Sequence, residues 1–340
     1  MFKKTLVAAA LATASMGANA AIQLAGDAVQ FYGQAAGFVT IASPDAKGAD
    51  ETITATIESR IGFRGVVEFE DFGPNFLWQI EGGNANHGGF DSATPWTHND
   101  NGQLGARDTY LGLGFDGVGS IKYGRQLVAA YNYVDWPHSN PGLGNVFDWN
   151  NDINGGYQDR ADNVIRFDSE TFNGFNFQAT VSGMESTTDA IVASIAASYQ
   201  AGPVNIHGGY YNQAEYKDSA GVKKGDTNYA ILGASAGFDS LTFTAAVKLM
   251  NNELADQEQI AYSATAQYVN NSFVYKLGYA ATTDAEQNGN KMKDTGDTAI
   301  TARLGYLLPS TYLFMDLRNY KMNAADGFDN NLLIGAEYYF

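Results

Sequence analysis

Apolar and polar side chains alternate along most of this chain, in segments of about ten residues that end at Gly, Pro, Asn or Asp. In residues 57–69, for example, most odd positions are apolar and most even positions are charged. Alternation with a period of two is the pattern of a β-strand with one face apolar and one face polar. No segment shows a convincing helical period. The pattern therefore predicts an all-β protein.

About sixteen segments share this alternation, an even number of the kind found in closed transmembrane β-barrels. They are residues 29–42, 52–69, 76–83, 105–115, 120–126, 163–168, 175–183, 191–200, 204–215, 228–238, 241–249, 260–269, 273–282, 299–308, 312–322 and 332–340. Backbone polar groups in a bilayer must all be paired, so such a sheet has to close on itself. We therefore expect Phe340 to pair beside residues 29–42. On the last segment we expect Ile334 and Tyr338 to face lipid and Leu333 to face the interior.

The connections between these segments alternate in length. Short turns lie at residues 71–74, 116–119, 201–203, 239–240, 270–272 and 309–310, and longer polar loops lie at 43–51, 84–104, 216–227, 250–259, 283–298 and 323–331. Short turns at one end and long loops at the other are typical of an antiparallel transmembrane barrel. A β-propeller also has regular short strands, but it repeats its sequence every four strands, and we find no such repeat.

The first twenty residues have the organisation of a secretory signal peptide. Lys3 and Lys4 precede an apolar run at residues 6–12, and Ala-Asn-Ala at 18–20 fits the small-residue rule for cleavage. The alternative is an N-terminal membrane anchor, but the run is too short to span a bilayer. We expect residues 1–20 to be a signal peptide and residues 21–340 to form one transmembrane β-barrel domain.

Charge and composition exclude several classes of protein. The chain has 20 Lys plus Arg against 37 Asp plus Glu, a net charge of −17, and removal of Lys3 and Lys4 takes it to −19. A chain this acidic repels phosphate backbones, so we expect no nucleic-acid partner. A mean hydropathy of −0.24 and the lack of a long apolar run exclude a helical membrane protein. The absence of cysteine excludes a disulfide framework.

One connection is much longer than the others and breaks the alternation. Residues 127–162 are rich in Trp and Tyr and carry several Asp between them. Long loops without strand periodicity are usually functional or disordered, and this aromatic content argues for a packed loop. A barrel of this size has an open aqueous lumen, and a loop folded inward would narrow it.

Several short motifs, in order along the chain, resemble the Gram-negative general bacterial porins. They are Ser59-Arg60-Ile61-Gly62-Phe63-Arg64-Gly65, Trp78-Gln79-Ile80-Glu81, Ala106-Arg107-Asp108-Thr109-Tyr110-Leu111-Gly112-Leu113, Tyr123-Gly124-Arg125-Gln126 and the terminal Phe340. The resemblance covers essentially all of residues 21–340. It implies a homotrimer of sixteen-stranded barrels in the outer membrane of a Gram-negative bacterium, in contact with lipid and lipopolysaccharide, with the third external loop folded into the lumen.

The resemblance also implies a constriction in which carboxylates on that loop face arginines on the opposite wall. By position, Asp135, Asp148 and Asp152 resemble the loop acids, and the wall cluster corresponds to Arg60, Arg64, Arg107 and Arg166. The loop lacks the Pro-Glu-Phe-Gly-Gly-Asp sequence of the enterobacterial members, so the resemblance does not single out one of the three acids. The implied function is passive diffusion of ions and small hydrophilic solutes through a water-filled channel.

An alternative is a sugar-selective channel. Trp136 and Trp149 lie in the long loop, and each follows a carboxylate, Asp135 and Asp148. An indole face offers a flat apolar platform to a sugar ring, and the adjacent acid accepts hydroxyl or amide hydrogen bonds. The loop is somewhat similar to that of marine chitooligosaccharide porins. The competing interpretation is that both tryptophans only pack the loop against the wall.

Other chemistry has little support in the sequence. The four histidines, His87, His98, His138 and His207, lack metal-ligand spacing, and we expect neither a metal nor a cofactor. The run from Asn150 to Gly155 resembles the opening of a calcium loop, but Ala161 stands where a bidentate Glu is required. A barrel enzyme would need a nucleophile and a base, and His138 beside Ser139 diverges from it in extended structure. We therefore expect no catalysis.

Overall fold

The computed structural model describes residues 21–83, 103–149, 152–184 and 188–340. The predicted signal peptide lies outside the described residues, as do His87, His98 and Asn150. No helix in these four ranges is long and apolar enough to cross a bilayer.

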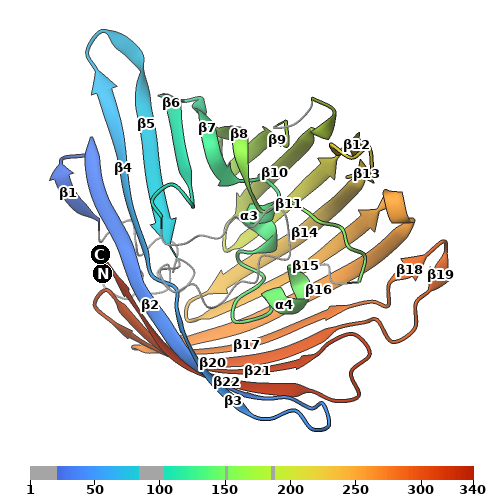
Figure 1. Ribbon diagram of the computed structural model, residues 1–340. Helices are drawn as coiled ribbons and strands as arrows, with labels where there is room; N and C mark the ends of the chain where they lie inside the picture. Colours follow the sequence, from blue (N-terminus) through green and yellow to red (C-terminus); the bar gives the residue numbers. More distant parts are fainter. Residues whose placement is uncertain (1–20, 84–102, 150–151, 185–187) are drawn as a thin grey trace.

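The fold is a closed antiparallel barrel of sixteen strands, as predicted (Figure 1). In chain order the barrel strands are β2 (Val29–Ser43), the interrupted strand β3 (Thr52–Ile57) with β4 (Arg60–Phe69), β5 (Phe72–Gly83), β6 (Thr109–Phe115), β7 (Gly119–Leu127), β8 (Arg160–Ser169), β9 (Phe175–Ser182), β10 (Val192–Ala201), β11 (Val204–Gln213), β14 (Thr227–Phe238), β15 (Leu241–Asn252), β16 (Gln257–Asn270), β17 (Phe273–Thr282), β20 (Thr298–Leu308), β21 (Thr311–Lys321) and β22 (Asp329–Tyr339). Each strand pairs with its neighbour in the chain, which is the up-and-down topology that short turns allow.

The barrel closes where its first and last strands meet. β2 pairs with β22 from Gln34 opposite Tyr339 to Ser43 opposite Asn330. Beyond β22, the amide of Phe340 donates to the carbonyl of Gly33 at 3.1 Å, and the amide of Gly33 donates back at 2.8 Å. The predicted pairing of the chain end with the first strand is therefore confirmed, and the sheet has no free edge at this seam.

The two faces of the wall follow the alternation of the sequence. In β17, Phe273, Tyr275, Leu277 and Tyr279 are exposed on the outside, and the residues between them are buried on the inside. β22 likewise exposes Ile334 and buries Leu333, as predicted. Apolar side chains outside and polar side chains inside are the arrangement of a wall between lipid and water.

Four details of the predicted strands are wrong. The segment 52–69 is interrupted at Glu58 and Ser59, because the amide of Ala36 donates to the Ser59 hydroxyl at 3.1 Å instead of to a carbonyl. The loop predicted at 250–259 is mostly strand and a short 3-10 turn, Glu253–Ala255. Two predicted loops contain hairpins, and a short strand precedes the barrel. These elements are β12 (Tyr216–Lys217) with β13 (Lys223–Lys224), β18 (Glu286–Gln287) with β19 (Asn290–Lys291), and β1 (Ile22–Ala25).

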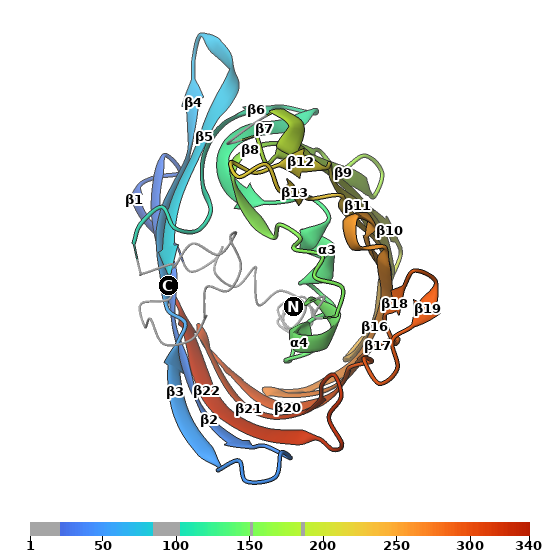
Figure 2. The same cartoon turned by 45° about the vertical axis from the view of Figure 1, so that its right-hand side comes forward.

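The long connection between β7 and β8 folds into the barrel. It contains two α-helices of four residues each, α3 (Tyr131–Val134) and α4 (Gly144–Phe147), the only α-helices in the described residues. Figure 2 shows both helices inside the ring of strands, beside β11 to β20 and away from β4 and β5. We call residues 128–159 the inner loop; it is slightly shorter than the predicted 127–162. The expectation of no helix was wrong here, because single helical turns are too short to show a period.

Candidate functional site

The inner loop is fixed to one side of the lumen by an apolar core. Its buried apolar side chains pack on inward-facing residues of β8 to β21. The buried loop residues of this core are Val128, Ala130, Val134, Leu143, Val146, Phe147, Ile153 and Tyr157. Burial of one large apolar side chain stabilises by about 1.5–3 kcal/mol. Together these residues hold the loop against the wall as part of the fold.

Asp152, one of the predicted loop acids, lies at a polar anchor of the loop. Its side chain is buried and accepts a hydrogen bond from the amide of Gln259 on β16 at 2.9 Å. It also accepts from the side-chain amide of Asn323, beyond β21. Asn252 on β15 adds a bond to the carbonyl of Ile153 at 2.8 Å. These contacts tie the descending end of the loop, which is the part around Asp152 and Ile153 that leads to β8, to three places on the wall.

Asp148 lies in a second polar anchor, around a buried lysine. Lys248 on β15 donates to the backbone carbonyl of Asp148 at 2.7 Å, between the rings of Tyr157 and Tyr229. The Tyr131 hydroxyl donates to the Asp148 carboxylate at 2.9 Å. Burial raises the pKa of Asp148 to about 7, although the positive charge of Lys248 acts in the opposite direction. Burial therefore favours the protonated form of this carboxyl group.

Asp135 is the predicted loop acid with an exposed side chain. It accepts a hydrogen bond from the Ser139 hydroxyl at 2.7 Å, which holds the carboxylate in place on the loop surface. The two tryptophans also differ. Trp149 is 51% exposed, whereas Trp136 is half-buried and packs near Lys276 of the wall, with the ammonium 5.8 Å from the ring centroid.

The predicted wall cluster is divided between two places. Arg60 and Arg64 lie on β4, which Figure 2 shows away from α3 and α4, and Arg107 lies just before β6. Arg166 lies on β8, close enough to Tyr133 of α3 to act on it electrostatically. Arg64 packs over the ring of Tyr32 at 4.7 Å and donates to Gln30 at 3.1 Å. Among the described residues, neither Arg60 nor Arg64 has a carboxylate within ion-pair distance. Within the described part of the chain, no ion pair balances the positive charge of these two arginines.

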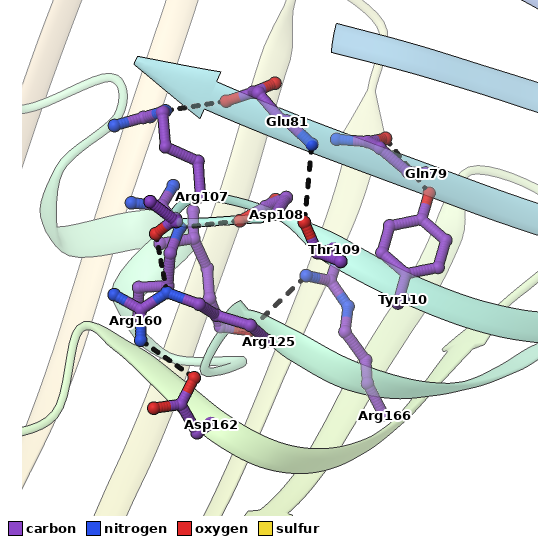
Figure 3. A network of polar contacts seen from close by, with 12 residues as sticks. Gln79, Glu81, Arg107, Asp108, Thr109, Tyr110, Arg125, Arg160, Asp162 and Arg166 are labelled. Atoms are coloured by element: carbon purple, nitrogen blue, oxygen red, sulfur yellow. Dashed lines mark hydrogen bonds and ion pairs between the residues drawn. The ribbon is translucent and has the colours of Figure 1, made fainter. Parts of the chain in front are cut away.

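The other two arginines belong to a series of ion pairs that we call the ionic ladder; Figure 3 labels the residues of its first three pairs. Its pairs are Arg107–Glu81 at 2.6 Å, Arg160–Asp108 at 2.6 Å, Arg125–Asp162 at 2.9 Å, Arg166–Asp168 at 2.8 Å and Lys122–Asp168 at 2.8 Å. Burial, together with Arg60 and Arg160 nearby, lowers the pKa of Arg107 to about 10, and Glu81 opposes this shift. Arg107 thus stays charged at physiological pH.

Gly83 makes the approach of two arginines possible. A Cβ atom at this position would lie 2.6 Å from Cδ of Arg107 and 3.0 Å from Cγ of Arg60. Both distances are shorter than normal van der Waals contacts. The absence of a side chain on Gly83 therefore lets Arg60 and Arg107 stand side by side at the end of β5.

A closed sixteen-stranded wall, a lumen narrowed by an inner loop and a charged facing wall together form a channel. The family profile of Gram-negative porins matches residues 6–338. The chain belongs to the Gram-negative porins. The porin is 34% identical over 334 residues to a chitoporin of Vibrio furnissii, covering 87% of each chain.

Solved porin structures share the fold. OmpF of Salmonella typhi, in complex with daunomycin, has a TM-score of 0.69 at 16% identity over 94% of this chain and all of OmpF. A loop-deletion mutant of OmpT of Vibrio cholerae has a TM-score of 0.68 at 16% identity, covering 92% of this chain and 99% of the other. An anion-selective porin of Comamonas acidovorans has a TM-score of 0.67 at 19% identity, over 92% and 99%. The porin is an outer-membrane channel of a Gram-negative bacterium.

Of the nine charged residues in the ionic ladder, only Arg107 and Arg166 were predicted from the sequence as site residues. Arg125 lies within one predicted segment and Arg160 lies shortly before another. Only the registers of β6 with β7 and of β7 with β8 bring them to Asp162 and Asp108. On the side that holds the inner loop, Asp316 of β21 pairs with Arg303 and Arg318. These residues could have been found in the sequence as charged residues at strand positions that face the lumen.

The histidines of the described chain form no metal site. His138 lies in the inner loop and His207 on β11, and both side chains are buried. Within the described residues, no group of three or more His, Asp or Glu side chains is arranged to hold a metal ion. The two rings contact each other and belong to the packing of the inner loop against the wall.

Proposed function

We propose that the porin allows ions and small hydrophilic solutes to diffuse passively through a water-filled lumen, as a homotrimer, without catalysis or a cofactor. The observation that carries this proposal is the fixed inner loop, which lies inside the ring of strands and packs against one side of the wall. The polar interior of the wall suits hydrated solutes. Lipid and lipopolysaccharide would surround the outer face, and residues 1–20 would be removed after export.

Within this channel we assign different roles to the three loop acids. Asp135, which is exposed, would supply the carboxylate of the constriction. Asp148 and Asp152, which contact the wall or the loop itself, would hold the loop in position. Arg60, Arg64, Arg107 and Arg166 would supply the facing positive charge. A solute would therefore pass between opposite charges.

We expect a modest preference for cations. The chain from residue 21 onward carries 18 basic and 37 acidic residues, a net charge of −19, which concentrates cations at the channel mouth. The arginines of the wall act in the opposite direction at the constriction. Charges separated by more than about 10 Å are screened at 0.1 M salt, so the preference should weaken as ionic strength rises.

Recordings from planar bilayers test the channel itself. Purified protein should give conductance steps in groups of three, and a gradient of potassium chloride should give a reversal potential of cationic sign at low salt. Absence of any conductance would refute the channel, single independent steps would refute the trimer, and anion preference at low salt would refute the selectivity.

A sugar-selective channel is the second candidate, favoured by the similarity to a chitoporin. Trp149, half-exposed at the loop surface, has an indole available to a sugar ring, and half-buried Trp136 stands next to exposed Asp135. Titration of single trimers with chitooligosaccharides and maltooligosaccharides tests this candidate in wild type, Trp136→Ala and Trp149→Ala. Saturable block by one sugar series that a tryptophan variant abolishes supports it, and no block by either series refutes it.

A further inference from the structure

A small pocket lies between the inner loop and the wall, toward the end of the barrel where β16 turns into β17 and β20 into β21. It is lined by Trp136 and Asn140 from the loop and by Gln267, Val274, Lys276, Arg303, Leu307 and Tyr312 from the wall. The wall residues are buried, while their strand neighbours such as Tyr275 and Leu277 face outward. The pocket therefore opens on the inside of the barrel.

Lys276 is the unusual member of this lining. Its side chain is only 8% exposed, and its ammonium lies 5.8 Å from the centroid of the Trp136 ring. No hydrogen-bond acceptor lies within bonding distance of its Nζ in the part of the chain that the structure describes. An ammonium in such a site loses hydration, and a weak contact with an aromatic face replaces only part of it.

The nearby carboxylates are already engaged. Asp316 accepts two hydrogen bonds from Arg303, at 2.6 and 2.7 Å, and two more from Arg318, at 2.6 and 3.1 Å. Glu337, which also acts electrostatically on Arg303, accepts a hydrogen bond from a tyrosine hydroxyl. Three cationic side chains thus lie near two carboxylates. The hydrogen bonds that these carboxylates accept come from Arg303, Arg318 and Tyr339. Lys276 therefore feels the charge of Asp316 but forms no ion pair of its own within the described part of the chain.

We propose that this pocket binds a small organic anion, with a carboxylate on the Lys276 ammonium. Asn140 and Gln267 border the charged end with amide groups, and Val274 and Leu307 line the remainder with apolar surface. A charged head with a short apolar tail, as in a monocarboxylate of about three carbons, matches this division. The pocket would be a local binding site for anions in a channel whose net charge is negative.

Iodide is the first probe, because it quenches an indole on contact and Trp136 borders the pocket. Quenching is measured on purified trimers in nonionic detergent, and the signal of Trp136→Phe is subtracted so that the remainder belongs to Trp136. We expect this remainder to saturate with iodide. Propionate should then displace iodide, whereas propionamide, of nearly equal size but uncharged, should not. Linear quenching, or equal displacement by propionamide, would overturn the proposal.

Variants assign the effect to Lys276. Lys276→Met should weaken apparent iodide affinity at least tenfold, and Lys276→Arg should keep it within about threefold, since one charge-assisted contact contributes about 1.4 kcal/mol or more. Lys122→Met is the matched control, because it removes a lumen lysine that is paired with Asp168. Circular dichroism verifies that each variant keeps its sheet. Equal loss in Lys122→Met and Lys276→Met would attribute binding to general charge and refute the pocket. The test is an equilibrium binding measurement, so it does not depend on conduction.

Discussion

His138 of the inner loop and His207 of β11 meet through their Nε2 atoms at 2.7 Å. The side-chain amide of Asn205 donates to the Ser198 hydroxyl, so its oxygen accepts from Nδ1–H of His207 at 3.0 Å. His207 Nε2 therefore carries no proton, and Nε2–H of His138 donates to it. His138 Nδ1 is then a buried acceptor, and it has no partner among the described residues. The contact is lost if Nε2 of His207 binds a proton, and a proton on Nδ1 of His138 would place a positive charge at a buried atom without a partner among the described residues.

Acid should therefore loosen the inner loop. Burial, reinforced by the neighbouring His207 and Lys276, lowers the pKa of His138 to about 3, whereas a solvated histidine titrates near 6.5. The docked loop binds fewer protons than the released loop between these values, so docking is fully stable above pH 6.5 and weakens as pH falls toward 3. At pH 4.5 we expect a loss of about 2–3 kcal/mol, one pKa unit being about 1.4 kcal/mol.

Protease cleavage within the inner loop, measured from pH 8 to pH 4.5 with an acid-tolerant protease, checks this prediction. Wild type should become more susceptible with acid. His138→Asn, which cannot titrate in this range, should show a flatter pH profile. An equal slope in both proteins would place the acid sensitivity elsewhere.

Asp148→Asn should stabilise the docked inner loop, because it removes the free-energy cost of burying an ionised carboxylate, which grows as pH rises. Since burial raises the pKa of Asp148 to about 7, the docked loop holds a proton that the released carboxylate, with an ordinary pKa near 4, has already lost. Docking in wild type therefore weakens as pH rises from about 4 to above 7. The asparagine keeps an acceptor for Tyr131 and the carbonyl for Lys248.

We expect Asp148→Asn to exceed wild type in thermal stability by about 1–3 kcal/mol at pH 9, with a smaller difference at pH 5. Near-ultraviolet circular dichroism, which reports on the packed tyrosines, provides the melting curves. A difference that shrinks as pH rises would contradict the assigned direction.

Asp152→Ala should release the descending end of the inner loop. The substitution leaves the amides of Gln259 and Asn323 without a carboxylate acceptor, at a cost of about 1–3 kcal/mol. Single-channel recordings should show added current noise, and protease should cleave the loop faster. Asn145→Ala, at an exposed position of the same loop, is the control and should resemble wild type.

Arg107→Gln should increase cation preference about twofold at low salt, because it removes one positive charge and leaves Glu81 without its ion-pair partner. The reversal potential in a potassium chloride gradient measures this shift, which should diminish at 1 M salt. Lys47→Gln removes the same charge from an exposed outer position and should have a smaller effect. A shift toward anions would show that Arg107 does not control the lumen.

The fold was predictable because each strand of a barrel wall carries its own alternation. The site was only partly predictable, since its contacts join residues distant in sequence. His138 and His207 are 69 residues apart, and Lys248 is 100 residues from Asp148. Nothing in the local pattern distinguishes exposed Asp135 from Asp148 beside Lys248. The difference arises when the inner loop docks on a particular register of β15, and a single sequence does not specify that register locally.

The ionic ladder also has a mechanical consequence. It spans the part of the barrel where the sheet is narrowest: β6 has only seven residues, and β8 pairs with β9 only from Ile165 to Asp168. Where backbone ladders are this short, ion pairs resist shear of one strand past the next. One joins β7 to β8, and two join the segment just before β6 to β5 and to β8. High salt weakens these ion pairs by screening. The rim of the barrel should therefore deform more easily at the same ionic strength at which the ion selectivity of the channel decreases.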